Sequence, residues 1–190
     1  MEKGIILASS SPRRIEILRK NHIEPVIIPP LVDETLPERI SKEQAVMYLA
    51  LKKALNVEKI CGEGIIIAAD TLVYKDRIIG KPRDEADAFE ILSALRNTRH
   101  EVITGIAIIE RGTCFRRVFY DVSQVYFKDF TTEAMLGYIA SGEVWDKAGG
   151  YAIQGEGGQF VDYIEGDYDN VVGFPWTRIK RELSGFGVRV

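Results

Sequence analysis

The chain has 190 residues, which is enough for one sizeable hydrophobic core or for two lobes. Its 25 basic and 28 acidic residues give a net charge of −3. Proteins that bind DNA or RNA usually carry a basic excess, because neutralising phosphates drives that binding. The charge therefore argues against a polymeric nucleic acid as partner, whereas a small phosphorylated ligand needs only a local basic cluster.

The apolar segments and the cysteines favour a cytoplasmic protein. No apolar run approaches the roughly 20 residues of a membrane-spanning helix, and the apolar residues 5–8 are too few for the core of a signal peptide. Cys61 and Cys114 are far apart and lie in no metal-binding spacing. We therefore expect two reduced thiols and no membrane partner.

Local patterns predict strands and helices in mixed order. Apolar runs and prolines predict extended segments at residues 5–8, 25–30, 65–69 and 102–109. Capping residues predict helices at residues 12–20, 41–57, 84–96 and 131–142, with a last helix from about residue 170 or 175 to 183. Two hairpins are expected, one at residues 74–79 and one pairing 113–119 with 122–127, and a short strand at 151–154.

These elements do not follow strict βαβ alternation. We therefore expect an α/β fold, on the border of α+β, with one long mixed twisted sheet flanked by helices. The chain shows no repeat, linker or low-complexity tract, so residues 1–190 are expected to form a single domain.

The first candidate site is the turn between the first strand and the first helix, Ser9-Ser10-Ser11-Pro12-Arg13-Arg14. Two arginines in the first helical turn face the positive end of the helix dipole, which is unfavourable unless an anion binds there. Free backbone N–H groups, the Ser9 hydroxyl and the guanidinium groups of Arg13 and Arg14 all suit phosphate oxygens. The alternative is a helix start with solvated arginines.

Two carboxylates are candidate metal ligands. Asp70 follows five apolar residues, so it is expected at the end of a buried strand, where it could act as a base or bind a divalent ion. Glu34, in the loop pair Asp33-Glu34, offers a second carboxylate. The alternatives are a turn-capping aspartate and a solvated acidic loop.

Two lysines and one glutamine complete the candidates. Lys52 falls beside apolar positions on its helical wheel, so it extends either to solvent or into a cleft. Lys81 lies on a Gly80-Lys81-Pro82 turn, in a chain without a P-loop motif. Gln154 ends the glycine-rich segment 146–155 and can donate to and accept from the edge of a base. Surface lysines and a flexible loop are the alternatives.

Other chemistries lack their motifs. The chain contains no H-E-x-x-H, no C-x-x-C and no G-x-S-x-G, and two histidines are too few for a typical zinc centre. Ser9, His100 and Asp70 could nominally form a triad, but His100 is expected to order a local turn instead.

The segments occur in the order seen in the Maf family, which the chain resembles over nearly its whole length. The resemblance is carried by Leu7-Ala8-Ser9-Ser10-Ser11-Pro12-Arg13-Arg14, Ala68-Ala69-Asp70-Thr71-Leu72-Val73, Ile79-Gly80-Lys81-Pro82, His100-Glu101-Val102-Ile103-Thr104-Gly105, and the blocks at 146–155 and 169–175. Arg96-Asn97-Thr98-Arg99 departs from the small turn expected before His100.

The resemblance implies a nucleoside triphosphate pyrophosphatase that uses a divalent metal, Mg²⁺ or Mn²⁺, and cleaves between the α and β phosphates. It implies an inosine-triphosphatase-like fold with two lobes, a site in the central cleft, and often a homodimer. Asp70 would be the proton acceptor, and Arg13, Thr71 and Gln154 match positions that mark the dTTP/UTP-preferring branch.

On this basis we hypothesise that Glu34 and Asp70 hold the metal, while Ser9, Arg13, Arg14, Lys52 and Lys81 bind the nucleotide's phosphates. Two alternatives stay open. One is a house-cleaning pyrophosphatase for non-standard purine triphosphates, and the other is a nucleotide-binding regulator of cell division without relevant turnover.

Overall fold

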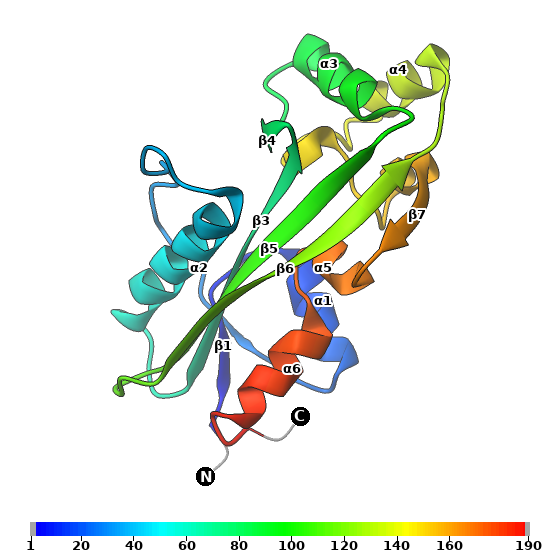
Figure 1. Ribbon diagram of the computed structural model, residues 1–190. Helices are drawn as coiled ribbons and strands as arrows, with labels where there is room; N and C mark the ends of the chain where they lie inside the picture. The colour runs from blue at the N-terminus through cyan, green and yellow to red at the C-terminus, as the bar shows by residue number, and fades with distance from the viewer. Residues whose placement is uncertain (1–2, 189–190) are drawn as a thin grey trace. The chain divides into compact units, whose positions relative to one another are not determined.

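The computed structural model describes residues 3–188 as a mixed sheet of seven strands flanked by helices (Figure 1). The strand order is β2-β1-β3-β5-β6-β7, and β4 pairs with β3 outside this path. The strands are β1 (Ile5–Leu7), β2 (Val26–Ile27), β3 (Ile65–Lys75), β4 (Arg77–Ile79), β5 (Arg99–Glu110), β6 (Arg116–Phe127) and β7 (Val161–Glu165). The expected α/β class with a mixed sheet is confirmed.

Eight helical segments are described within residues 3–188. They are α1 (Pro12–Lys20), α2 (Lys42–Glu58), α3 (Glu85–Leu95), α4 (Thr132–Ala140), the 3₁₀ turns η1 (Ala148–Gly150) and η2 (Glu156–Phe160), α5 (Tyr168–Val172) and α6 (Trp176–Ser184). No helix in this range is both long and apolar enough to cross a membrane.

The chain divides into two compact units. Of the described residues, 3–70, 104–121 and 173–188 form the first unit, and 71–103 and 122–172 form the second. The strands β3, β5 and β6 each contribute residues to both units.

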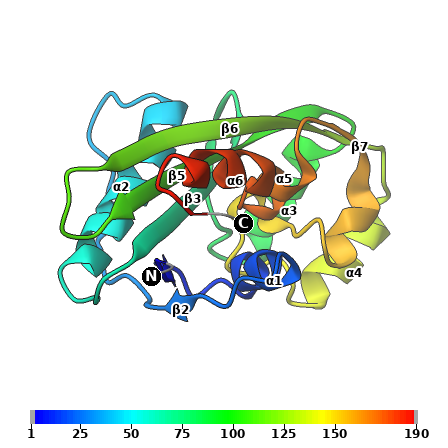
Figure 2. The same ribbon diagram turned by 90° about the horizontal axis from the view of Figure 1, so that it is seen from below.

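In the first unit, α2 lies on one side of the strands, and α1 and α6 lie on the other (Figures 1 and 2). The strand β1 is continuously buried and pairs in parallel with both β2 and β3. The helix α2 begins with a capping box, in which Ser41 and Gln44 exchange side-chain to backbone hydrogen bonds. Its inner face packs on small and branched residues of the sheet, among them Ile66, Ala68, Ala107 and Ile109, and on Ala8 just after β1.

A glycine lets α2 approach the sheet closely. A Cβ atom on Gly105 of β5 would lie 2.3 Å from the backbone carbon of Val46 and 2.6 Å from the backbone nitrogen of Met47. Only a residue without a side chain fits this gap, so Gly105 determines how near α2 lies to β5 in this unit.

The second unit has an aromatic core. His100 is buried and packs edge-on against Phe127, with ring centroids 4.9 Å apart, and its Nε2 lies 2.7 Å from the Tyr151 hydroxyl. Burial, helped by the charge of Lys75, lowers the pKa of His100 to about 3, so its ring is neutral at pH 7. The expectation that His100 orders a turn is wrong, because the residue lies within β5 and belongs to this core.

Three other expectations about local structure are wrong. β3 continues five residues past Asp70, because Leu72 and Val73 return to the core, so Asp70 lies within the strand and not at its end. Residues 116–127 form the single strand β6, which pairs with β5, and not a hairpin of their own. Residues 151–154 form a turn between η1 and η2, while β7 was not expected.

Candidate active site

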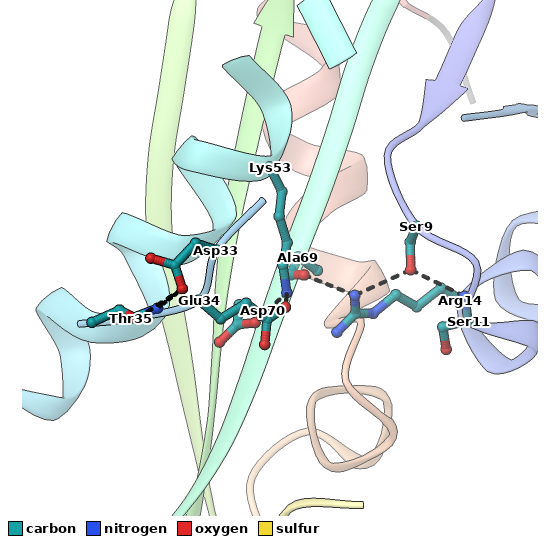
Figure 3. Close-up of polar contacts among 9 residues, drawn as sticks. All are labelled: Ser9, Ser11, Arg14, Asp33, Glu34, Thr35, Lys53, Ala69 and Asp70. Atoms are coloured by element: carbon teal, nitrogen blue, oxygen red, sulfur yellow. Dashed lines mark hydrogen bonds and ion pairs between the residues drawn. The ribbon is translucent and has the colours of Figure 1, made fainter. Parts of the chain in front are cut away.

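The turn between β1 and α1 is held together by Ser9. Its Oγ accepts hydrogen bonds from the backbone nitrogen of Ser11, at 3.1 Å, and from Nη1 of Arg14, at 3.3 Å (Figure 3). Because Oγ is the acceptor in both, its own hydrogen remains to be donated, and a phosphate oxygen is a suitable acceptor. Ser11 is the N-cap of α1 but makes no side-chain cap, so the first helical turn keeps N–H groups that can face an anion.

Arg14 stabilises this turn through hydrogen bonds from its buried guanidinium group. Its Nε donates to the carbonyl oxygen of Gly173 at 3.0 Å, and its Nη1 also donates to the carbonyl oxygen of Ala69 at 2.8 Å. Loss of hydration on burial lowers the pKa of Arg14 to about 10, although the negative charge of Asp70 opposes the shift, and the guanidinium stays charged at pH 7. The contact expected between Arg14 and phosphate stays a prediction, in addition to these structural hydrogen bonds.

Arg13 differs from Arg14 in its contacts. Its Nε is buried and has no hydrogen-bond partner among the described residues. A buried N–H group without a partner is costly and is uncommon in native proteins. The first turn of α1 also contains no acidic residue, so an anionic ligand would both satisfy Arg13 and favour the helix dipole.

Lys53 brings two carboxylates together. Its Nζ lies 2.6 Å from Oδ1 of Asp70 and 2.7 Å from Oε1 of Glu34 (Figure 3). The side chains of Lys53 and Asp70 are only 12% and 13% exposed, whereas that of Glu34 is 54% exposed. The cluster therefore consists of a nearly buried ion pair, Lys53 with Asp70, and a solvent-exposed carboxylate, Glu34.

The loop before α2 places Glu34 at this cluster. Oδ1 of Asp33 accepts hydrogen bonds from the backbone nitrogen of Thr35, at 3.0 Å, and from its hydroxyl, at 2.7 Å. The backbone nitrogen of Leu31 donates to Oδ1 of Asn56 on α2 at 2.9 Å. The Asp33 bonds close a turn around Glu34. The Leu31 bond ties the loop to α2, the helix that also carries Lys53.

The electrostatics of Asp70 suit a group that exchanges a proton or binds a metal. Burial raises the pKa of its carboxyl, and Glu34 raises it further, while the charges of Lys53 and Arg14 act in the opposite direction. On balance the pKa of Asp70 is raised above its ordinary value, on a carboxylate that has cations close by.

Lys53 was not predicted from the sequence, whereas its neighbour Lys52 was. The ammonium of Lys52 lies 5.6 Å from the centre of the Tyr48 ring, and its predicted contact with phosphate stays a prediction. A signal for Lys53 was present in the sequence, because it continues the helical stripe of buried residues Val46, Leu49 and Ala50 at spacings of three and four.

The remaining candidates belong to the second unit. Thr71 follows Asp70 within β3, Lys81 is exposed on the turn after β4, and Gln154 is exposed between η1 and η2. The backbone nitrogen of Gly149 donates to the carbonyl oxygen of Gly80 at 3.0 Å. This bond joins the Lys81 turn to the glycine-rich segment that carries Gln154.

The carboxylates of the first unit fit a magnesium-type ion. Among the described residues, no group of three or more His, Cys, Asp or Glu side chains could form a metal cage from protein ligands alone. Mg²⁺ is usually bound by one or two carboxylates together with water and substrate phosphates. Glu34 and Asp70, which share Lys53 as a partner, provide that donor set.

Comparisons with known proteins show which family the chain belongs to. The chain is 46% identical to the dTTP/UTP pyrophosphatase of Bacillus cereus (strain AH187), over 99% of this chain and 98% of the relative. It is 45% identical to the dTTP/UTP pyrophosphatase of Bacillus anthracis (strain CDC 684 / NRRL 3495), again over 99% of this chain and 98% of the relative. A solved structure, that of the Staphylococcus aureus Ham1 protein, matches with a TM-score of 0.45 and 19% identity, over 67% of this chain and 73% of that one. The family model for "Maf-like protein" matches residues 4–186. The chain belongs to the Maf family.

Proposed function

We propose that this protein is a metal-dependent pyrophosphatase that hydrolyses dTTP and UTP to the nucleoside monophosphate and pyrophosphate. The observation that carries the proposal is Lys53, whose ammonium lies between the carboxylates of Asp70 and Glu34. The same unit contains the turn at Ser9, with the unpartnered Nε of Arg13. The activity named for the Bacillus relatives supports the choice of substrate.

Asp70 is the proposed proton acceptor for the attacking water. Proton transfer requires it to be ionised, and the neighbouring ammonium of Lys53 favours that state. Glu34 and Asp70 would hold Mg²⁺ or Mn²⁺, which when bound neutralises phosphate charge and makes water more acidic. No covalent nucleophile is needed, because pyrophosphate is a good leaving group.

The phosphates are proposed to bind mainly at the β1–α1 turn. Ser9 donates its hydroxyl hydrogen, and Arg13 and Arg14 supply positive charge at a helix N-terminus. Lys52 and Lys81 are proposed to offset further charge on the triphosphate. Arg13, Thr71 and Gln154 are proposed to select the nucleotide, with the Gln154 amide pairing with the edge of the pyrimidine.

We further propose that the protein is cytoplasmic, that its chain forms a single Maf domain and that two chains form a homodimer. Cys61 and Cys114 are both free, which supports a reducing compartment such as the cytoplasm. One family model spans residues of both units, which supports treating the chain as a single Maf domain. The family resemblance is also the basis for proposing a homodimer.

A panel of triphosphates with Mg²⁺ or Mn²⁺ tests the proposed function. Pyrophosphate and orthophosphate are assayed separately, and the monophosphate is measured by chromatography. The proposal predicts equal amounts of monophosphate and pyrophosphate, with dTTP and UTP as the best substrates. A preference for inosine or xanthosine triphosphate would contradict the substrate, orthophosphate without monophosphate would contradict the reaction, and tight binding of UTP without turnover would indicate a regulator.

A further inference from the structure

Glu143 joins the two ends of the glycine-rich segment that carries Gln154. Near the start of the segment, Nζ of Lys147 donates to the carbonyl oxygen of Glu143 at 2.6 Å. At its end, the carboxylate of Glu143 accepts the backbone N–H groups of Glu156, at 2.9 Å, and Gly157, at 3.2 Å. Residues 147–157 therefore form a loop whose two ends are both hydrogen-bonded to Glu143, and Gln154 lies within this loop.

The carboxylate of Glu143 is itself held by the core of the second unit. The Tyr138 hydroxyl donates to its Oε1 at 3.1 Å. Tyr138 is only 1% exposed, and its ring packs edge-on against Phe160 with centroids 5.2 Å apart. The loop is therefore attached through Glu143 to the aromatic core of the second unit.

Two glycines make room for this carboxylate. A Cβ atom on Gly155 would lie 2.3 Å and 2.4 Å from the two carboxylate oxygens of Glu143, and one on Gly157 would lie 2.7 Å from the Tyr138 hydroxyl. A side chain at either position would force the groups apart. Gly155 and Gly157 therefore allow Glu143 and Tyr138 to come close to the loop backbone.

The charge state of Glu143 agrees with its role as an acceptor. Partial burial raises the pKa of its carboxyl, but the hydrogen bonds from Glu156, Gly157 and Tyr138 outweigh burial and lower the pKa below the ordinary value. The group is ionised at pH 7, and hydrogen bonds to an ionised acceptor are stronger than those between neutral groups.

We propose that Glu143 is a positioning residue for substrate selection, because it fixes the loop that presents the Gln154 amide to the pyrimidine base. The inference rests on the proposed function only in assigning Gln154 to the base. Glu143 acts through the loop backbone and contacts no substrate. Its loss would leave the phosphate-binding turn and the Asp70 cluster intact, since all of those residues belong to the other unit.

The test compares Glu143→Gln with Glu156→Gln, which removes the same charge from an exposed side chain in the same loop. For Glu143→Gln we expect KM for UTP to rise about tenfold with kcat within about twofold, since roughly one hydrogen bond to the base is lost. Discrimination of UTP against CTP should fall by a similar factor. Tyr138→Phe, which removes one hydrogen bond and keeps the ring, should change KM in the same direction by less.

A double-mutant cycle separates positioning from general destabilisation. If Glu143 acts through Gln154, Glu143→Gln should change KM less than twofold in a Gln154→Ala background. A full effect in that background would overturn the inference, as would unchanged KM and selectivity in folded Glu143→Gln. If Gln154→Ala alone leaves UTP selectivity unchanged, the role of Gln154 in the proposed function fails instead.

Amide hydrogen exchange tests the loop closure independently of activity. In Glu143→Gln, the amides of Glu156 and Gly157 should exchange faster than in the native protein, while Glu156→Gln should leave the amide of Gly157 protected. Unchanged protection in Glu143→Gln would overturn the inference, whether or not the protein hydrolyses UTP.

Discussion

Nζ of Lys53 on α2 lies 2.6 Å from Oδ1 of Asp70 on β3, and both side chains are almost buried. Charges are rarely buried without a compensating partner, and each member of this pair supplies it for the other. The same ammonium also pairs with Glu34, so one lysine connects the helix, the strand and the loop of the proposed metal site.

Replacing Lys53 by Met should affect turnover more than binding. The substitution leaves Asp70 buried without its close cation, which favours the protonated carboxyl that cannot act as a base. We expect kcat for UTP to fall by about 100-fold or more. Lys52→Met should mainly raise KM, because Lys52 is proposed to contact phosphate only. Steady-state kinetics of the two folded variants measure both effects. A fall in kcat for Lys52→Met with only a rise in KM for Lys53→Met would contradict the roles proposed for the two lysines.

Replacing Arg14 by Lys should weaken the β1–α1 turn although the charge is kept. A lysine has no planar fork, so it cannot reproduce the hydrogen bonds to Ala69, Gly173 and Ser9 together. We expect the free energy of unfolding to fall by about 2 kcal/mol, because at least one buried acceptor loses its partner. Urea denaturation measures the change, and a loss below about 0.5 kcal/mol would show that the bracing role is minor.

Replacing Gly105 by Ala should destabilise the first unit. The new Cβ atom would overlap the backbone of α2 at Val46, and overpacking of this kind costs typically 1–3 kcal/mol. Gly137→Ala is the matched control, because Gly137 lies inside α4 with open space around it. In a helix, alanine is more favourable than glycine by about 0.5–1 kcal/mol. Opposite shifts in urea midpoints are expected, and an unchanged midpoint for Gly105→Ala would contradict the close approach.

Stability should fall in mild acid because of His100. Its pKa is about 3 in the folded protein and about 6.5 in an unfolded chain, so the unfolded state binds more protons between these values. The stabilisation from neutral His100 is complete above about pH 6.5 and is lost as the pH falls, by up to about 1.4 kcal/mol per pH unit.

The measurement is urea denaturation at pH 7 and pH 5 for the native protein and His100→Phe, which keeps the aromatic packing. The variant should lose less stability between the two pH values than the native protein. His22→Asn is the control, because His22 is exposed and asparagine tolerates its positive φ of 62°. Equal losses in the native protein and His100→Phe would contradict the burial effect.

Local signals predicted the helices well. Ser41, Asp84 and Thr131 each cap a helix where the sequence indicated one, and their side chains accept the expected backbone hydrogen bonds. The same signals could not show that β3 continues past Asp70, because the polar pair Asp70-Thr71 after an apolar run resembles the end of a strand. Tyr120 and Asp121 similarly resembled a turn, but β6 runs through them.

The candidate site was predicted only in part, because local patterns do not show which distant residues come into contact. The sequence indicated Asp70 after its apolar run and the β1–α1 turn with its two arginines, and it offered Glu34 as a second carboxylate beside the alternative of a solvated loop. Lys53 was missed because its partners are 17 and 19 positions away, and only the packing of α2 brings them together. Glu143 was missed because its role depends on backbone N–H groups, which no sequence pattern displays.

The rate of pyrophosphate release from UTP by Asp70→Asn tests the central claim most directly. Asparagine keeps the shape of the side chain but removes the charge that is proposed to accept a proton and to bind the metal. We expect turnover to fall by about 10³-fold or more, while the variant still binds UTP and unfolds cooperatively. Turnover close to that of the native protein would contradict the role of Asp70 and, with it, the assignment of the Lys53 cluster as the active site.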